Sequence, residues 1–183
     1  MQKRKTESKQ YIKKALTLLL QDKPFEQISI SDITRKAGIN RGTFYLHYKD
    51  KYDMLKQFKE ELLTNLYTIL RNNHHDTDRY TILVNTFSYL QSDFEFIQAF
   101  SMISSMNFSK TIKDFVLDII LEFPQSKTVI SEHYGVPYPY AIEVYLASIE
   151  SLISLWVSTG GKETPQEMTT IISKVLKLDP TEP

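Results

Sequence analysis

Apolar residues recur at helical spacing near the start of the chain. The positions i, i+3, i+4 and i+7 hold Ile12, Ala15, Leu16 and Leu19. This pattern predicts a helix from about Glu7 to Asp22, and Pro24 ends it because proline has no backbone N–H to donate. A longer pattern after Asp50 places on one face Leu55, Phe58, Leu62, Leu66 and Ile69. It predicts a long fourth helix, for which Asp50 is a suitable N-cap.

Two very short helices are predicted between these longer ones. Ser29 and Asp32 have the spacing of a capping box, and the narrow apolar stripe that follows ends at Gly38. Asn40 is a good N-cap for the next helix, Arg41 to about His47. Two short helices joined across a glycine turn have the size and turn chemistry of a helix-turn-helix.

The polar run from residue 71 to residue 79 has no apolar periodicity and indicates a boundary. Beyond it, helical patterns cover about 79–91, 93–105 and 109–122, then a loop with Pro124, Gly135, Pro137 and Pro139, then two more helices. No stretch alternates as a strand would. We therefore predict an all-α protein with an N-terminal three-helix head, residues 6–66, whose long fourth helix leads to a C-terminal helical domain, residues 72–183.

Composition is that of an ordinary soluble globular protein, with 42% hydrophobic and 24% charged residues. The absence of cysteine excludes disulfide frameworks, thiol nucleophiles and cysteine-ligated zinc. No apolar run reaches the roughly 20 residues needed to cross a bilayer, and the first ten residues lack the hydrophobic segment of a signal peptide. We expect a cytoplasmic protein with no membrane partner.

The formal net charge of zero hides a strong asymmetry along the chain. Residues 1–60 hold fourteen Lys or Arg against seven Asp or Glu, a net charge of +7, and the remainder holds eight against fifteen. A basic segment beside an acidic one is typical of a polyanion-binding head. A solvated lysine-rich helix surface would produce the same asymmetry, so charge alone does not decide between them.

The segment ISISDITRKAGINRGTFYLHYKDKYDML, residues 28–55, closely resembles the DNA-binding signature of the TetR family of regulators. It contains the pattern T-x-Y-x-H-Y-x-x-K over residues 43–51. The resemblance implies a bacterial, sequence-specific transcriptional regulator that binds double-stranded operator DNA as a homodimer. In this family the default is a repressor released by a small-molecule effector.

The resemblance also implies roles for individual residues in the head. The family holds phosphates at the positions that match Ser29, Ser31, Thr43, Tyr45, His47 and Lys51. The positions near base edges match Arg41, Gly42 and Leu46. Arg41 is the best candidate for direct readout, since a guanidinium can bond O6 and N7 of guanine together, although it could equally bind a phosphate. Leu46 stands where the family often has an aromatic residue, so base preference is expected to differ.

Apolar stripes on the last two predicted helices need a partner surface. Their members include Tyr145, Ile149, Leu152, Ile153, Ile171 and Val175. They either cover the subunit's own core or, as the resemblance implies, form a dimeric four-helix bundle. The body also holds residues that would line an effector pocket or simply fill the core, namely Phe96, Phe100, Met102, Met106, Phe108 and Trp156.

Two alternatives come from other functional classes. An enzyme is disfavoured because the sequence has no Walker-type loop, GxGxxG, HExxH or nucleophile elbow. His74 and His75 would diverge on a helix, so we predict no metal and no cofactor. The second alternative is a TetR-like co-regulator that acts through protein partners without an operator of its own. The intact pattern over residues 43–51 argues against it.

Overall fold

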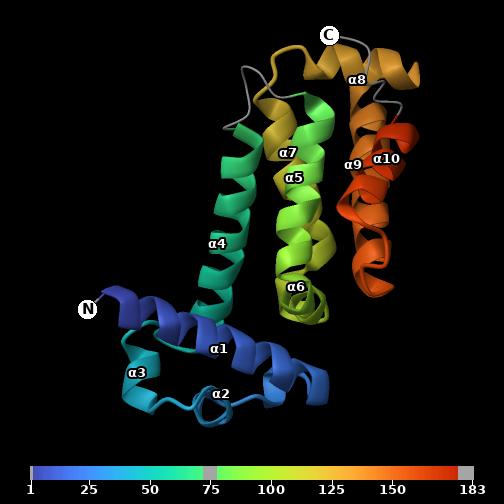
Figure 1. Ribbon diagram of the computed structural model, residues 1–183. Helices are drawn as coiled ribbons and strands as arrows, with labels where there is room; N and C mark the ends of the chain where they lie inside the picture. Colours follow the sequence, from blue (N-terminus) through green and yellow to red (C-terminus); the bar gives the residue numbers. More distant parts are fainter. Residues whose placement is uncertain (1, 72–77, 177–183) are drawn as a thin grey trace.

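The computed structural model describes residues 2–71 and 78–176, and within these ranges it contains helices and no strand. The head contains α1 (Gln2–Asp22), η1 (Phe25–Gln27), α2 (Ile30–Ala37) and α3 (Arg41–Tyr45), and α4 (Lys51–Arg71) leads out of it. The body contains α5 (Arg79–Ser92), α6 (Phe94–Ser101), η2 (Ser104–Met106), α7 (Phe108–Leu121), α8 (Ser126–Tyr134), α9 (Tyr138–Ser158) and α10 (Pro165–Val175). Figure 1 shows the head below the body, with α4 rising beside it. The predicted all-α class is confirmed.

α1 and α8 differ most from the sequence predictions. The first helix begins at Gln2, five residues before the predicted start. The expected proline and glycine loop after residue 122 contains α8, a nine-residue helix that fits between Pro124 and Gly135. Gly135 ends it in the left-handed conformation, with φ 65°. Only Ile130 of α8 is buried, so the apolar periodicity of this segment is weak, and the flanking proline and glycine residues favoured a loop prediction.

The predicted domain limits stay a prediction. The fourth helix continues past residue 66 to Arg71. Residues 72–77 and 177–183, which fall within the predicted second domain, lie outside the described residues.

The core of the head extends into α6, the second helix of the body. We call head core the buried cluster that contains Ile12, Leu16, Phe25, Ile28, Ile33, Phe44, Tyr48, Met54, Leu55 and Phe58 together with Phe96, Phe100 and Ile103. The last three residues come from α6 and the segment after it. Ile97, also on α6, belongs instead to the body core around Trp156. Because α6 is buried on both sides, it joins the two parts of the molecule.

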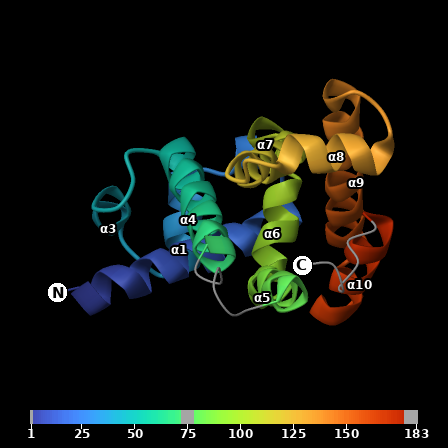
Figure 2. The ribbon, with the colours of Figure 1, turned by 90° about the horizontal axis from the view of Figure 1, so that it is seen from above.

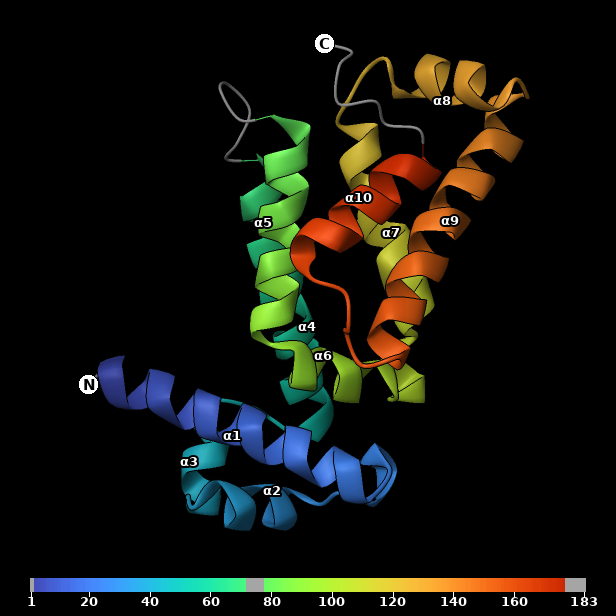
Figure 3. The same ribbon diagram turned by 45° about the vertical axis from the view of Figure 1, so that its right-hand side comes forward.

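Polar and aromatic contacts fasten α6 to α1 and α4. The Phe58 and Phe96 rings meet edge to face with centroids 5.5 Å apart. The Lys13 ammonium pairs with the Asp93 carboxylate and lies 4.3 Å from the centroid of the Phe96 ring. Partial burial lowers the pKa of Lys13, against the opposing charge of Glu61. In Figures 1 and 3, α6 accordingly sits directly on α1.

The body packs its helices around a central tryptophan. Trp156 is 2% exposed, lies edge to face with Phe87 and Phe94, and donates from Nε1 to the Glu163 carbonyl at 3.1 Å. α10 packs against α5, while α9 packs against α7 and α8. Figure 2 shows α8 lying across the end of the α9 column. α9 is long and apolar enough to cross a bilayer by length and composition alone, and its buried side forms part of this core.

Candidate nucleic-acid interface

Local hydrogen bonds define both ends of α2 and the turn to α3. The Ser29 hydroxyl accepts from the Asp32 N–H at 3.1 Å, and the Asp32 carboxylate accepts from the Ser29 N–H at 3.0 Å. This backbone N–H and the Lys23 ammonium hold the pKa of Asp32 well below its usual range. Gly38 ends α2 with φ 67°, and the Ile39 N–H reaches back to the Thr34 carbonyl at 3.0 Å. The predicted capping box and glycine turn are therefore confirmed.

α3 is a five-residue helix that is capped at its N-terminus by Asn40. The Asn40 side chain accepts from the Thr43 N–H at 2.7 Å and from the Thr43 hydroxyl at 3.0 Å. Phe44 points inward with its side chain fully buried, and the helix ends at Tyr45, two residues before the predicted end. His47 follows in a turn and is half-buried.

The outward face of α3 carries large exposed side chains. Leu46 is 71% exposed and Tyr45 is 48% exposed, although both are large and partly or wholly apolar. The Arg41 guanidinium lies beside them and donates to the Tyr45 hydroxyl at 3.1 Å. Because Tyr45 and Leu46 do not pack on the head core, the outward face of α3 is available for a partner.

The serine and threonine side chains expected to hold phosphates differ in how they are engaged. Ser31 is exposed, and among the described residues its hydroxyl has no hydrogen-bond partner. The hydroxyls of Ser29 and Thr43 are both bound within their caps. Each of these oxygens keeps at least one lone pair that can accept a further hydrogen bond.

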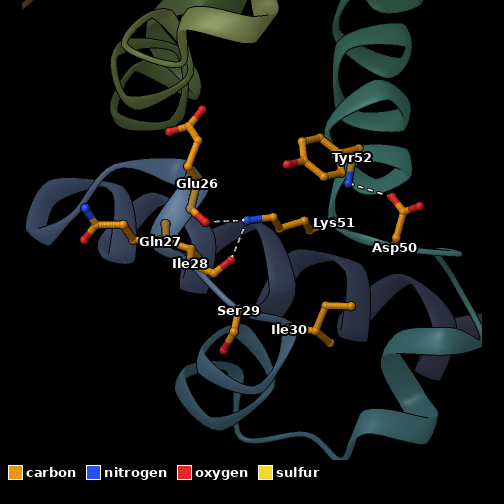
Figure 4. Close-up of a pocket in the computed structure, with 8 residues that line it drawn as sticks. All are labelled: Glu26, Gln27, Ile28, Ser29, Ile30, Asp50, Lys51 and Tyr52. Carbon is orange, nitrogen blue, oxygen red and sulfur yellow. Dashed lines mark hydrogen bonds between the residues drawn. The ribbon is translucent and has the colours of Figure 1, made fainter.

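Lys51 has internal partners that the sequence did not indicate. Its ammonium donates to the carbonyl oxygens of Phe25 and Glu26 at 3.0 Å each, and of Ile28 at 2.9 Å. Figure 4 shows the Lys51 side chain reaching across to the Glu26 and Ile28 carbonyls. An ammonium has three N–H donors, so these bonds use all of them. The phosphate contact expected of Lys51 stays a prediction, and it would require the ammonium to leave these carbonyls.

Comparison with known proteins agrees with this geometry. The family model described as bacterial regulatory proteins, tetR family, matches residues 12–58, and the one described as transcriptional regulator C-terminal region matches residues 77–178. The chain belongs to the TetR family. Its helix-turn-helix is thus the family's DNA-binding element.

Individual TetR-family relatives are distant in sequence. The HTH-type transcriptional regulator YxbF of Bacillus subtilis is 29% identical over 171 residues, covering 86% of this chain and 42% of YxbF. The chain spans less than half the length of the curated relatives it matches. A TetR-family regulator from Syntrophomonas wolfei has a similar structure, with TM-score 0.65 and 19% identity over 97% of this chain and 96% of that one. The dihydroxyacetone kinase operon activator DhaS has a similar structure, with TM-score 0.61 and 19% identity over 93% of this chain and 94% of DhaS.

The six residues expected to line an effector pocket do not surround one cavity in this TetR-family fold. Phe96 and Phe100 lie in the head core, whereas Trp156 lies in the body core. Met106 packs against the head core and Phe108 against both cores. Met102 is 69% exposed. Helical periodicity placed these side chains on apolar faces, but it could not show which core each face meets.

The predicted dimer residues lie mainly on the inward side of α9 and α10. Ile149 is buried in the body core, and Val175 is 49% exposed. The remaining four are partly buried against that core, namely Tyr145, Leu152, Ile153 and Ile171. The fully outward apolar side chains of α9 are different ones, Tyr140, Val144 and Leu155. Their four- and eleven-residue spacing was a signal that sequence reasoning missed.

His74 and His75, which the sequence analysis considered as metal ligands, lie outside the described residues. Among residues 2–71 and 78–176, no group of three His, Cys, Asp or Glu side chains is arranged to hold an ion.

Proposed function

We propose that this TetR-family protein is a cytoplasmic, homodimeric repressor that reads operator DNA with α3 and is released by a small-molecule effector. The outward face of α3 is the observation that carries the proposal. Arg41, Tyr45 and Leu46 are exposed there on the basic part of a chain whose remainder is acidic. A short helix with an exposed guanidinium at its first turn fits the major groove, where arginine reads guanine.

The neighbouring groups fit a phosphate backbone. Gly42 has no side chain at the second position of α3, so its backbone can approach DNA closely. Thr43 and Tyr45 lie on α3, His47 follows it, and Ser31 lies in the first turn of α2. We assign them, with Ser29, to phosphate contacts that orient α3, and we assign Arg41, Gly42 and Leu46 to the base edges.

Dimerisation through α9 is supported by its unburied apolar side. Only 28% of the apolar stretch of α9 is buried within the subunit. The exposed side carries Tyr140, Val144 and Leu155, at 70%, 48% and 60% exposure, with Ser151 between them. A row of exposed apolar side chains on a helix is stabilised when a partner surface removes it from water. A second copy related by a two-fold axis would cover this stripe and present two α3 helices to successive major grooves.

Operator binding is tested by titrating the full chain with DNA from around its own gene, beside a scrambled duplex, at several salt concentrations. Arg41→Ala should remove about 1–3 kcal/mol of discrimination at one base position. Arg79→Ala, an exposed arginine at the start of α5, is the control with the same charge change and should bind as the native protein does. Equal, salt-controlled binding to both duplexes would refute operator reading and favour the co-regulator that acts through protein partners.

The dimer is tested by the mass of the protein in solution. Leu155→Glu places a charge at the C-terminal end of the outward stripe and should yield monomers at concentrations where the native chain is dimeric. Glu143→Gln, an exposed neighbour on α9, is the matched control and should stay dimeric. A monomeric native protein would contradict the assignment.

A further inference from the structure

A hydroxyl-rich cavity lies where the α6–α7 connection faces α9. Its volume is about 340 Å³, which falls within the range of small-molecule sites. The side that comes from α6, η2 and the start of α7 is formed by Ser101, Ile103, Ser104, Asn107, Phe108 and Ser109. α9 contributes Ser154 and Ser158. Five of these eight residues are serines and none carries a charge.

The hydrogen-bonding groups of this cavity include both acceptors and donors. The hydroxyls of Ser101, Ser154 and Ser158 donate within the protein, to Gln98, Glu150 and Leu155, so their lone pairs remain for a ligand. Ser104 and Ser109 have no partner for their hydroxyls among the described side chains and backbone. The Asn107 Oδ1 accepts from the Lys110 N–H at 3.1 Å, which leaves the Asn107 amide N–H groups as donors.

We infer that this cavity binds a neutral polyhydroxyl compound of about monosaccharide size, which is the effector of the proposed function. An alcohol group donates and accepts at once and so matches a lining of both kinds. An anion is disfavoured because Ser154 is bonded to the Glu150 carboxylate at 2.8 Å, which would repel it. Ile103 and Phe108 supply apolar surface for the C–H face of such a molecule.

The position of the cavity connects ligand binding to the head. Ile103, on one wall, belongs to the head core, and Phe108 packs against both cores. The opposite wall is α9, where Ser154 and Ser158 lie beside the stripe of the proposed dimer surface. A ligand that bridges these walls changes the position of the α6–α7 connection relative to α9. Since α6 is fastened to the head through Phe96, this alters the spacing of the two α3 helices and weakens operator binding.

The test is calorimetric titration of the full chain with glycerol, xylitol and D-glucose, and with gluconate as the charged counterpart. We expect saturable binding of at least one neutral probe and none of gluconate. Ser109→Ala and Ser154→Val each remove one hydrogen-bonding group and should weaken binding about three- to tenfold. The control is Ser131→Val on α8, whose hydroxyl donates to the Lys127 carbonyl four residues earlier, and it should bind as the native chain does.

Absence of saturable binding by all three neutral probes at about 10 mM, tenfold above millimolar affinity, would overturn the inference. Preferred binding of gluconate, or equal binding by Ser154→Val, would also overturn it. Operator binding by the same preparation is measured without probe. If DNA binds and no neutral probe does, the ligand inference fails while the proposed function stands. If a probe binds and no DNA does, the cavity is supported and the proposed function fails.

Discussion

The Lys51→Met substitution tests whether the Lys51 ammonium stabilises the head through internal hydrogen bonds or contacts a DNA phosphate. Methionine keeps most of the side-chain length and removes the ammonium that donates to the carbonyls of Phe25, Glu26 and Ile28. Hydrogen bonds to charged groups contribute roughly 1.5–3 kcal/mol each. Because Lys51 is only half-buried, water screens it, and we take about 1 kcal/mol for each bond, or about 3 kcal/mol in total.

This loss is large enough to measure by thermal unfolding. For a chain of this size, about 2–4 °C of melting temperature corresponds to 1 kcal/mol, so we expect Lys51→Met to melt roughly 6–12 °C lower. The control is Lys49→Met, which removes the same charge from an exposed side chain and should change the melting temperature little. Circular dichroism of the DNA-free protein supplies the measurement.

The competing role predicts a different pattern. A phosphate contact at Lys51 would leave the melting temperature of the free protein unchanged, because no internal bond would be lost. It would instead reduce by about one the slope of log binding constant against log salt concentration. An unchanged melting temperature together with that smaller slope would refute the internal role.

Four further predictions concern stability. Asp32→Asn should melt at a lower temperature than the native protein at pH 7, because the fold stabilises the ionised Asp32 carboxylate and so lowers its pKa below the unfolded value. The difference in melting temperature should shrink as the pH falls below about 4, where the carboxyl of the unfolded chain takes up a proton. A difference that is independent of pH down to the acid limit would contradict this. Gly38→Ala, at φ 67° with open space around the new Cβ, should cost about 1 kcal/mol by urea unfolding. Gly161→Ala should cost more, roughly 2–4 kcal/mol, since its Cβ would lie 2.5 Å from the Phe94 ring at φ 62°; the reverse order would show that the ring moves freely. Phe96→Ala should cost about 3–5 kcal/mol in the same assay, and a loss under 1 kcal/mol would mean that the head core does not depend on α6.

Local features of the fold could be predicted from the sequence because each depends on residues within one or two turns. Ser29 and Asp32 form their capping box across three residues, and Asn40 caps α3 across the same distance. Gly38 permits a left-handed backbone whatever packs around it. The helix-turn-helix, the candidate DNA face and the family all rest on this short stretch. α8 was missed because its few apolar positions gave weak periodicity between strong turn signals.

The remaining features depend on how helices pack, which periodicity does not encode. Lys51 finds its carbonyl acceptors 23 to 26 residues earlier in the chain, so no local pattern indicates them. α9 carries apolar residues on more than one side, and only its packing against α7 and α8 decided that Ile149 is buried while Leu155 faces outward. The serine-lined cavity is formed by residues 101–109 together with Ser154 and Ser158. No sequence pattern indicates that these two segments lie close together. The sequence by itself determined the helices, their caps and the DNA-binding signature. The tertiary structure decided which faces meet, because burial depends on neighbours that the chain brings from far away.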